Sequence, residues 1–388
     1  MLSVFRSPVA AVRAVFFVQA ICIGGFFSRL AELQQAMGAT PAEFGLVLIG
    51  FDVGALLSFP FTSAAIERFG TRQVLLWVLP AFALATAVIC AVPNLFFFFF
   101  TAILVVVGFT FTATAMNVEA DRVEFDTGRR VMNSCHGLWS FGFLVSSLAG
   151  TALVAAGVPP LLHLLGLVAV VGLGTLLIVS PLLPSPARPH VAAGKAPRFA
   201  VPTLPILMII AFALGSIWLE AAIRSWSVIY LRDTFSTANW VATVTLPVCI
   251  GAQVVGRLLA DGWIEKFGPV RVAAALTAVS SVGLLLVVFG PTVPIVLAGF
   301  VLVGFGVASA SPQATSAAAR LGDRPASVNV AAFQLMNTVV LFLAPPVMGF
   351  TASEWGLRAS FALMIPMLLL AIFMSHVLAE RAEPAPAT

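Results

Sequence analysis

Long apolar stretches, each ending at a short polar or turn-forming segment, follow one another along almost the whole chain. Residues 73–118, 131–187 and 272–319 contain no Asp, Glu, Lys or Arg. Each of these runs is long enough for two membrane-spanning helices of about 20 residues, and prolines and glycines divide it in two. Because an open backbone cannot be hydrogen bonded in hydrocarbon, the spans must be helical. The pattern predicts twelve helices, at residues 11–36, 43–66, 73–93, 95–118, 131–155, 160–182, 203–229, 237–262, 272–290, 294–318, 328–352 and 358–379.

A short charged segment occurs twice, at corresponding places in the two halves. Glu67-Arg68-Phe69-Gly70-Thr71-Arg72 follows the second predicted span, and Glu265-Lys266-Phe267-Gly268 follows the eighth, 198 residues later. Repetition of this kind is typical of transporters built from two related bundles. We therefore expect an all-α membrane protein with 12 transmembrane helices in two pseudo-symmetric six-helix bundles. The expected parts are residues 1–182, a cytoplasmic linker 183–202, residues 203–380 and a cytoplasmic tail 381–388.

Composition supports the membrane interpretation. Of the 388 residues 60% are hydrophobic and only 9% are charged, so a soluble globule could not cover its surface with polar groups. The basic start leads into an apolar stretch that continues past Phe27 without a small-residue cleavage site, so we expect a retained first span. The four cysteines all fall inside predicted spans, which favours neither a disulfide framework nor a metal site, and no cofactor is expected.

The positive charges predict the orientation in the membrane. If both termini are cytoplasmic, fifteen of the twenty Lys and Arg residues lie on the cytoplasmic side, which is the positive-inside pattern. Arg29, Arg224, Arg232 and Arg358 fall on the other side, and Arg257 lies near the inner end of its span. This bias accounts for the basic character without nucleic acid. We expect a multi-pass inner-membrane protein that is monomeric.

The first charged segment also carries a family resemblance. Residues Ser63 to Arg72 resemble the loop between helices 2 and 3 of the major facilitator superfamily, G-x-L-x-D-R-x-G-R-R, with Ser63 in place of the first glycine and Glu67 in place of the aspartate. The segment from Gly256 to Asp261 is similar to the weaker second copy in that superfamily. With the twelve spans and the central linker, the resemblance covers nearly the whole chain and implies the fold of these transporters.

Two regions have narrower resemblances. Asn117 to Arg130, with the following segment to Gly142, is similar to the helix 4 to helix 5 region of fucose-permease-like proton symporters. Glu220 to Asp233 resembles helix 7 of the YbjJ-type bacterial inner-membrane proteins. There are departures. Phe27 and Thr114 stand where the fucose symporters carry acids, so their proton-coupling residues do not transfer, and Ser225 stands where the YbjJ-type pattern usually has an acid.

Three titratable residues inside the spans are candidates for proton coupling: Asp52, Glu220 and His136. Asp52 lies about nine residues into the second span, where an unpaired acid costs roughly 2.5 to 3.5 kcal/mol. It either takes up and releases a proton as access alternates, or is a structural acid that is bonded to a neighbouring helix or lies close to the outer water layer. Glu220 precedes Arg224 by four residues, so an intrahelical ion pair is the simpler interpretation, and a cavity-facing gate is the alternative.

Polar residues on the fifth span form a stripe. Asn133, His136 and Ser140 recur at i, i+3 and i+7, and Trp139 borders the same face, so the stripe can contact a substrate in a cavity. Close helix packing through small residues is the alternative for this face.

The eleventh span has a matching stripe, Gln334, Asn337 and Thr338, and Gln253 of the eighth span faces either a cavity or packing. Matching stripes in the two halves indicate a site at their interface near the midplane.

The repeated charged loops have a mechanical role by resemblance, because superfamily members use such acid and base pairs to latch the two halves on the cytoplasmic side. A solvated loop is the alternative, but it does not account for the repetition. The residues to which this cytoplasmic gate would fall here are Glu67, Arg68, Arg72, Arg129, Arg130, Asp261, Glu265 and Lys266.

We expect a secondary active transporter that moves a small polar solute, sugar-like or another organic metabolite, by alternating access coupled to protons, with symport as the first choice. A proton-coupled efflux antiporter is the runner-up. Residues 137–150 contain no proline, so the Gly-Pro signature of antiporters is missing. A sensor with a transporter fold is a third possibility. An enzyme is not expected, because the sequence offers no nucleophile and base pair, metal-ligand cluster or phosphate-binding loop.

Overall fold

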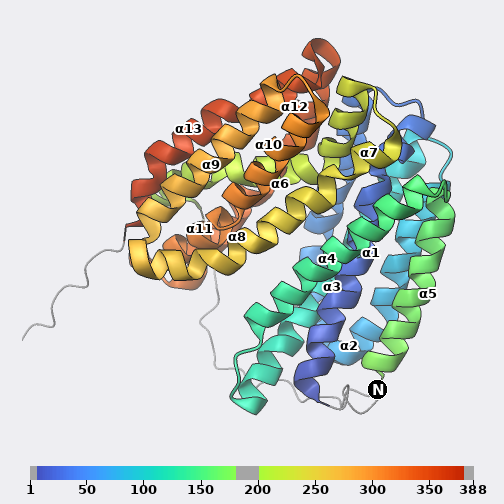
Figure 1. Cartoon of the computed structure of the whole chain (residues 1–388). Helices are drawn as coiled ribbons and strands as arrows, with labels where there is room; N and C mark the ends of the chain where they lie inside the picture. Colours follow the sequence, from blue (N-terminus) through green and yellow to red (C-terminus); the bar gives the residue numbers. More distant parts are fainter. Residues whose placement is uncertain (1–6, 181–200, 380–388) are drawn as a thin grey trace, which may run out of the picture. The chain divides into compact units, whose positions relative to one another are not determined.

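The computed structural model describes residues 7–180 and 201–379, and every regular element in them is helical (Figure 1). The helices are α1 (Pro8–Ala36), α2 (Pro41–Val88), η2 (Ile89–Ala91), α3 (Leu95–Thr127), α4 (Met132–Ala155), α5 (Pro160–Ile178), α6 (Leu204–Phe235), α7 (Asn239–Thr243), α8 (Thr245–Phe267), α9 (Pro269–Phe289), α10 (Val293–Val307), α11 (Ala310–Ala319), α12 (Ala326–Ala362), α13 (Met364–Met374) and η3 (Ser375–Leu378).

Ten helical segments of the described residues are long and apolar enough to cross a membrane. Two of them, Pro41–Ala91 and Val328–Leu378, contain 51 residues each, more than twice the length that a bilayer core requires. Both are broken by a glycine with non-helical φ and ψ, Gly70 in α2 and Gly356 in α12. Each therefore supplies two spans, and the expected twelve-helix membrane fold is confirmed.

One helix is longer than the sequence pattern predicts. The prediction ended the fourth span at residue 118 with a charged loop after it, which is wrong, because α3 continues to Thr127 and ends where Gly128 takes a left-handed conformation with φ 66°. The charged residues after 118 are good helix formers, so the helix continues past the apolar stretch until a glycine stops it.

The repeat between the halves extends to the backbone of the turns. Eight described residues have positive φ, and they form four pairs: Gly38 with Ser236, Gly70 with Gly268, Gly128 with Gly322 and Gly157 with Gly356. The second member follows the first by 198, 198, 194 and 199 residues. Both copies of the Phe-Gly turn also place a cation over the adjacent ring at 5.2 Å, Arg68 over Phe69 and Lys266 over Phe267.

The chain divides into two compact units that are described separately. Unit 1 comprises Met1–Ala192, Ala222–Gly251 and Phe342–Ser360, and unit 2 comprises Ala193–Ala221, Ala252–Leu341 and Phe361–Thr388. Unit 1 thus combines the first-half helices with the last part of α6, all of α7, the start of α8 and residues 342–360 of α12. The expected linker cations Arg188, Lys195 and Arg198, and the expected tail 381–388, lie outside the described residues.

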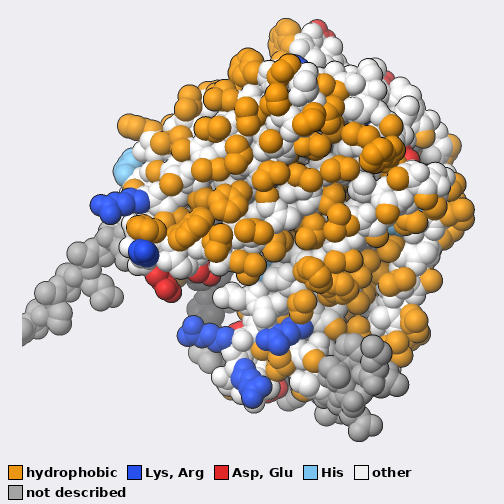
Figure 2. Space-filling view, viewed as in Figure 1, with side chains coloured by type: hydrophobic (Ala, Val, Ile, Leu, Met, Phe, Trp, Pro, Cys, Tyr) orange, Lys and Arg blue, Asp and Glu red, His pale blue; other side chains and the backbone are white. Residues whose placement is uncertain are grey.

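Some apolar side chains pack between helices, and others form an apolar outer surface. On the face in Figure 2 hydrophobic side chains cover most of the surface, and Lys and Arg side chains lie near helix ends. Trp77 and Trp355 are each 75% exposed, which suits a surface that faces lipid. Inside, Cys22, Cys135 and Cys249 are buried, as expected for small apolar packing residues.

Candidate functional site

Two glycines bring first-half and second-half helices into backbone contact within unit 1. A Cβ added to Gly45 of α2 would lie 2.5 Å from the carbonyl oxygen of Pro345 in α12, and one added to Gly349 would lie 2.4 Å from that of Pro41. No side chain fits between the helices at this crossing. The start of α2 is also bonded to α12, because the Ala42 backbone N–H donates to Ser353 Oγ over 2.9 Å.

An arginine makes a second link at the same end of the helices. The Nη1 of Arg232 in α6 donates to the backbone oxygen of Ala31, and its Nη2 donates to Gln34 Oε1, each over 2.6 Å. Both acceptors lie in the last two turns of α1, where unsatisfied carbonyls and the helix dipole favour a cation. Asp233 accepts from the same guanidinium, so all three nitrogens are used.

A third link joins α4 to α7. Thr151 Oγ1 lies 3.4 Å from the carbonyl oxygen of Thr243, the last residue of α7. These links lie at the opposite end of α1, α2 and α4 from the charged turn at Gly70. Unit 1 is therefore closed at the end that the charge pattern assigns to the outside.

Asp52 lies on the side of α2 that faces away from α3. Gly50 and Gly54, two residues before and after it, pack against the backbone of α3 at Phe99 and Ile103. At 100° per residue Asp52 points in the opposite direction, on the same face as Gly45, which is seven residues or about 10 Å away. This is the face that meets α12 at Pro345 and Gly349.

Asp52 differs from three glutamates of the helices in having no partner among the described residues. Glu32 pairs with Arg29 at 2.7 Å, Glu119 with Arg122 at 3.3 Å, and Glu220 with Arg257 at 4.0 Å. Asp52 is half-buried and makes no hydrogen bond or ion pair with any residue that the structure describes. The structural alternative, an Asp52 held by a neighbouring helix, finds no partner there.

The predicted stripe on α4 divides into exposed and buried members. Asn133 and His136 are exposed, and the His136 ring meets Phe16 of α1 edge to face with centroids 5.2 Å apart. Trp139 is half-buried. Ser140 is 8% exposed and donates to the His136 backbone oxygen over 3.1 Å, so its hydroxyl serves its own helix.

Gln19 is a site residue that the sequence analysis did not single out. Its side chain is fully buried, and its Oε1 accepts from Trp139 Nε1 over 2.7 Å. Its Nε2 donates to Thr112 Oγ1 of α3 over 3.0 Å. A single amide thereby ties α1, α3 and α4 together and fixes the Trp139 indole. The sequence does carry a signal for it, because Gln19 is the one polar residue in the apolar run from Ala14 to Gly25.

A series of neighbouring aromatic rings runs from Trp139 to the end of unit 1 where α2 packs against α12. Neighbouring centroids are 5.6 to 6.4 Å apart along the series Trp139, Phe143, Phe27, Phe26, Phe51, Phe98, Phe44 and Trp226. The residue next to Phe51 is Asp52, so the acid lies beside an apolar aromatic layer rather than among charges. Such surroundings penalise an unpaired carboxylate.

His163 of α5 is buried against α1. It is 5% exposed, and its Nδ1 accepts from Arg29 Nε over 3.0 Å. Because a guanidinium can only donate, His163 is neutral and carries its proton on Nε2. Arg29 also pairs with Glu32 of its own helix at 2.7 Å, and its bond to His163 joins α1 to α5.

In unit 2 the candidates lie on three helices. Arg257 of α8 lies 4.0 Å from Glu220 of α6 and donates from Nε to the Ala308 backbone oxygen over 3.3 Å. Pro312, four residues on, has no N–H to offer that oxygen, so Arg257 replaces the missing helix bond.

The remaining unit 2 candidates are amides. Asn337 Nδ2 lies 3.4 Å from Gln334 Oε1 on α12, and the Asn337 Oδ1 is buried without a partner among the described atoms. The same holds for Nε2 of Gln253, which is 6% exposed on α8. These unsatisfied amide atoms are suited to a polar ligand or ordered water.

The charged turn of the first half is anchored by residues outside the predicted gate. Thr71, next to Gly70, donates to Glu119 Oε2, and Arg122 lies 3.3 Å from both. Arg72 Nη2 donates to the Ser180 backbone oxygen over 2.7 Å.

The other predicted gate residues are solvent-facing. Within unit 1 Glu67, Arg68, Arg129 and Arg130 are exposed and form no ion pair with a described residue. In unit 2 Asp261, Glu265 and Lys266 are likewise exposed. Their role as a latch stays a prediction.

The sequence is similar to those of known membrane transporters. Residues 14–248 and 228–388 match the Major Facilitator Superfamily. An uncharacterised transporter of Sinorhizobium fredii, y4wD, is 29% identical over 363 residues, covering 92% of this chain and 94% of that protein.

Among solved structures, a bacterial homologue of the human lysosomal transporter Spinster, in an inward-facing and unoccupied conformation, has a TM-score of 0.79 at 13% identity, covering 98% of this chain and 99% of that one. The fucose:proton symporter of E. coli has a TM-score of 0.63 at 16% identity, covering 97% and 100%.

Proposed function

The chain belongs to the Major Facilitator Superfamily and is therefore a multi-pass secondary transporter of a small molecule, and we propose that it moves a small polar solute together with protons. The family consists of transporters rather than enzymes. The finer proposal is import by symport, with both termini in the cytoplasm.

The observation that carries the proposal is the unpartnered carboxyl of Asp52. Glu32, Glu119 and Glu220 each have an arginine within 4.0 Å, whereas Asp52 has no cation beside it among the described residues. An unpaired charge at this depth costs about 2.5 to 3.5 kcal/mol, so the closed arrangement of unit 1 favours an Asp52 that holds its proton. Separation of α2 from α12 would admit water to the same face and allow the proton to exchange. Proton binding and closure of the outer end are thereby linked.

The substrate class follows from the exposed stripe on α4. Asn133 and His136 offer an amide and an imidazole to a ligand, and Trp139 offers a flat apolar ring that Gln19 holds in place. Hydrogen-bonding groups beside an aromatic face suit a hydroxylated, sugar-like solute or a similar organic metabolite. We propose Asn133, His136 and Trp139 as substrate contacts in the first half, with Gln253, Gln334 and Asn337 in the second. Ser140 is a weaker candidate, because its hydroxyl already bonds the backbone of α4.

The charged turns are proposed to act as a cytoplasmic gate. Glu67, Arg68 and Arg72 of the first half, with Arg129 and Arg130, would pair with Asp261, Glu265 and Lys266 of the second half when the outside is open. The exposure of all of them except Arg72 supports this proposal, because their charges are accessible to a partner. Glu220 and His136 are secondary candidates for proton coupling. Glu220 ranks below Asp52 because it has a cation within 4.0 Å.

A transport experiment tests the proposal. Purified protein is first screened by thermal shift against sugars, organic acids, amino acids and aromatic cations. Proteoliposomes with an internal pH dye then receive each hit from outside. Symport predicts that the solute and protons enter together. Proton movement in the opposite direction would favour the efflux antiporter, and binding without any flux would favour a sensor.

A further inference from the structure

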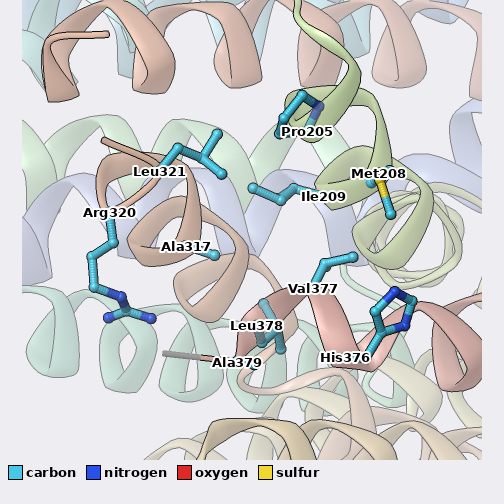
Figure 3. Close-up of a pocket in the computed structure, with 10 residues that line it drawn as sticks. All are labelled: Pro205, Met208, Ile209, Ala317, Arg320, Leu321, His376, Val377, Leu378 and Ala379. Carbon is cyan, nitrogen blue, oxygen red and sulfur yellow. The ribbon is translucent and has the colours of Figure 1, made fainter. Parts of the chain in front are cut away.

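A cavity of about 260 Å³ lies in unit 2 where the start of α6, the end of α11 and η3 meet (Figure 3). Its floor is apolar, with Ile209 and Leu378 each 1% exposed and Ala317 6% exposed. Arg320 and His376 lie on either side of the apolar side chains in the close-up. None of the ten lining residues is acidic. The cavity therefore combines an apolar base with cationic or protonatable edges.

Arg320 has no acidic partner among the residues that the structure describes. It is exposed, it follows the last residue of α11, and its guanidinium makes no hydrogen bond or ion pair with a residue of the described ranges. The glutamates and aspartates that neutralise other arginines, such as Arg122 and Arg232, have no counterpart in this cavity. The positive charge at its rim is thus available to an external anion.

His376 is held so that one ring nitrogen is left for a ligand. Its Nδ1 lies 2.9 Å from the Phe373 backbone oxygen, which can only accept, so Nδ1 carries a proton. Nε2 is therefore the nitrogen that can face a ligand.

The location selects a membrane lipid over a soluble anion. Leu207 on α6 and Phe373 on α13 are 42% and 72% exposed, so the helices that frame the cavity present apolar side chains outward. The charge pattern of the chain assigns this end of the helices to the cytoplasmic boundary of the bilayer, where the head groups of anionic phospholipids lie. A phosphate in the rim and an acyl chain along the apolar floor would use both features.

We propose that the cavity binds the head group of an anionic phospholipid, with Arg320 and His376 as its phosphate contacts. The lipid would join α6, α11 and η3, three segments of unit 2 that come from distant parts of the sequence. This site is separate from the polar stripes proposed for the substrate, so it does not depend on the proposed transport function.

The full chain in detergent, titrated with phosphatidylglycerol and analysed by native mass spectrometry, tests the proposal. Wild type should retain one phosphatidylglycerol more tightly than phosphatidylcholine, and Arg320→Gln should weaken that binding about five-fold, the usual loss for one basic residue near a lipid surface. His376→Gln should weaken it too. Arg271→Gln removes another exposed arginine at the start of α9 and should leave the binding unchanged.

Thermal unfolding in the same samples gives a second measurement. Phosphatidylglycerol should raise the melting temperature of wild type and of Arg271→Gln more than that of Arg320→Gln. Equal retention of phosphatidylglycerol by wild type and Arg320→Gln would overturn the proposal and indicate another occupant, such as the C-terminal residues of the chain. Equal binding of phosphatidylcholine, or equal stabilisation by inorganic phosphate alone, would overturn it as well.

Discussion

Gly45 and Gly349 pack so closely that a Cβ on Gly45 would lie 3.1 Å from the Cα of Gly349, and a Cβ on Gly349 would lie 3.0 Å from the Cα of Gly45. The obstacles are backbone atoms, which cannot rotate away as a side chain can. In a membrane, where no hydrophobic effect drives helices together, such close approach is a main source of helix association. Closure of unit 1 between α2 and α12 therefore depends on both positions being glycine.

Gly45→Ala should open this end of the protein. Leu48, one turn further along α2, is 2% exposed and becomes a reporter when it is replaced by cysteine in a background without the native cysteines. We expect a membrane-impermeant maleimide to label Cys at position 48 several-fold faster when Gly45→Ala is also present. Gly172→Ala in α5 is the matched control, because a Cβ there meets no atom within 4 Å. Equal labelling in all three backgrounds would contradict the role of the glycine contact.

Arg232→Gln should weaken the same closure through a different contact. The substitution removes the hydrogen bonds to Ala31 and Gln34, and a hydrogen bond to a charged group in a largely buried site contributes about 2 kcal/mol. We expect faster labelling at position 48 and a lower melting temperature. Arg232→Lys keeps the positive charge but loses the planar guanidinium that reaches both acceptors, so its labelling rate and melting temperature should be intermediate. If Arg232→Gln behaved like Arg271→Gln, Arg232 would have no part in the closure.

Ser236→Gly should stabilise the protein. Ser236 has φ 49° and is the one residue other than glycine with positive φ in the described ranges, at the position that Gly38 occupies in the first half. A left-handed conformation costs a residue with a Cβ about 1 kcal/mol, which glycine avoids. The melting temperature should rise by a few degrees at most. Ser316→Gly, inside α11, should lower it, because glycine weakens a helix interior. A fall with Ser236→Gly would mean that the serine side chain stabilises the turn.

The turn between α11 and α12 should be sensitive to acid. Asn329 Nδ2 donates to Asp323 Oδ1 over 2.7 Å, and this bond, with Arg324 nearby, holds the pKa of the Asp323 carboxyl below its usual value. A lowered pKa stabilises the folded state above the usual value, and that contribution is lost as the pH falls through the lowered one.

The melting temperature of wild type should therefore exceed that of Asp323→Asn by a constant amount from pH 8 to about pH 5, and the gap should close below about pH 4. Asp126→Asn, at an exposed acid with no bond to a described residue, should show no such gap. A gap that is independent of pH would show that the Asp323 charge is not what stabilises the turn.

The apolar pattern was sufficient to predict the helices. Every expected span is helical over most of its length, because in lipid only a helix pairs the backbone groups of an apolar run. Glycine at the repeated turns was equally informative, since Gly70 and Gly268 both adopt a positive φ. The error at α3 arose because helix propensity, rather than hydropathy, decides where a helix ends outside the membrane.

Partner choice could not be predicted in the same way. A single helix sequence gives the direction of Gln19, His163 and Arg232, but it does not give the helix that lies opposite. Gln19 bonds Thr112 and Trp139 because α3 and α4 both meet α1 at that height. Gly45 and Gly349 are 304 residues apart, and no local pattern connects them. Such contacts depend on the packing of the whole bundle.

Asp52 bears the central claim, and solute flux in proteoliposomes tests it most directly. Asp52→Asn keeps the shape of the side chain but cannot release a proton, whereas Asp52→Glu keeps the titratable group. The account predicts that Asp52→Asn loses accumulation of the solute driven by a pH gradient but retains exchange of labelled for unlabelled solute, while Asp52→Glu retains part of both. Accumulation by Asp52→Asn equal to that of wild type would contradict the claim that Asp52 couples transport to protons.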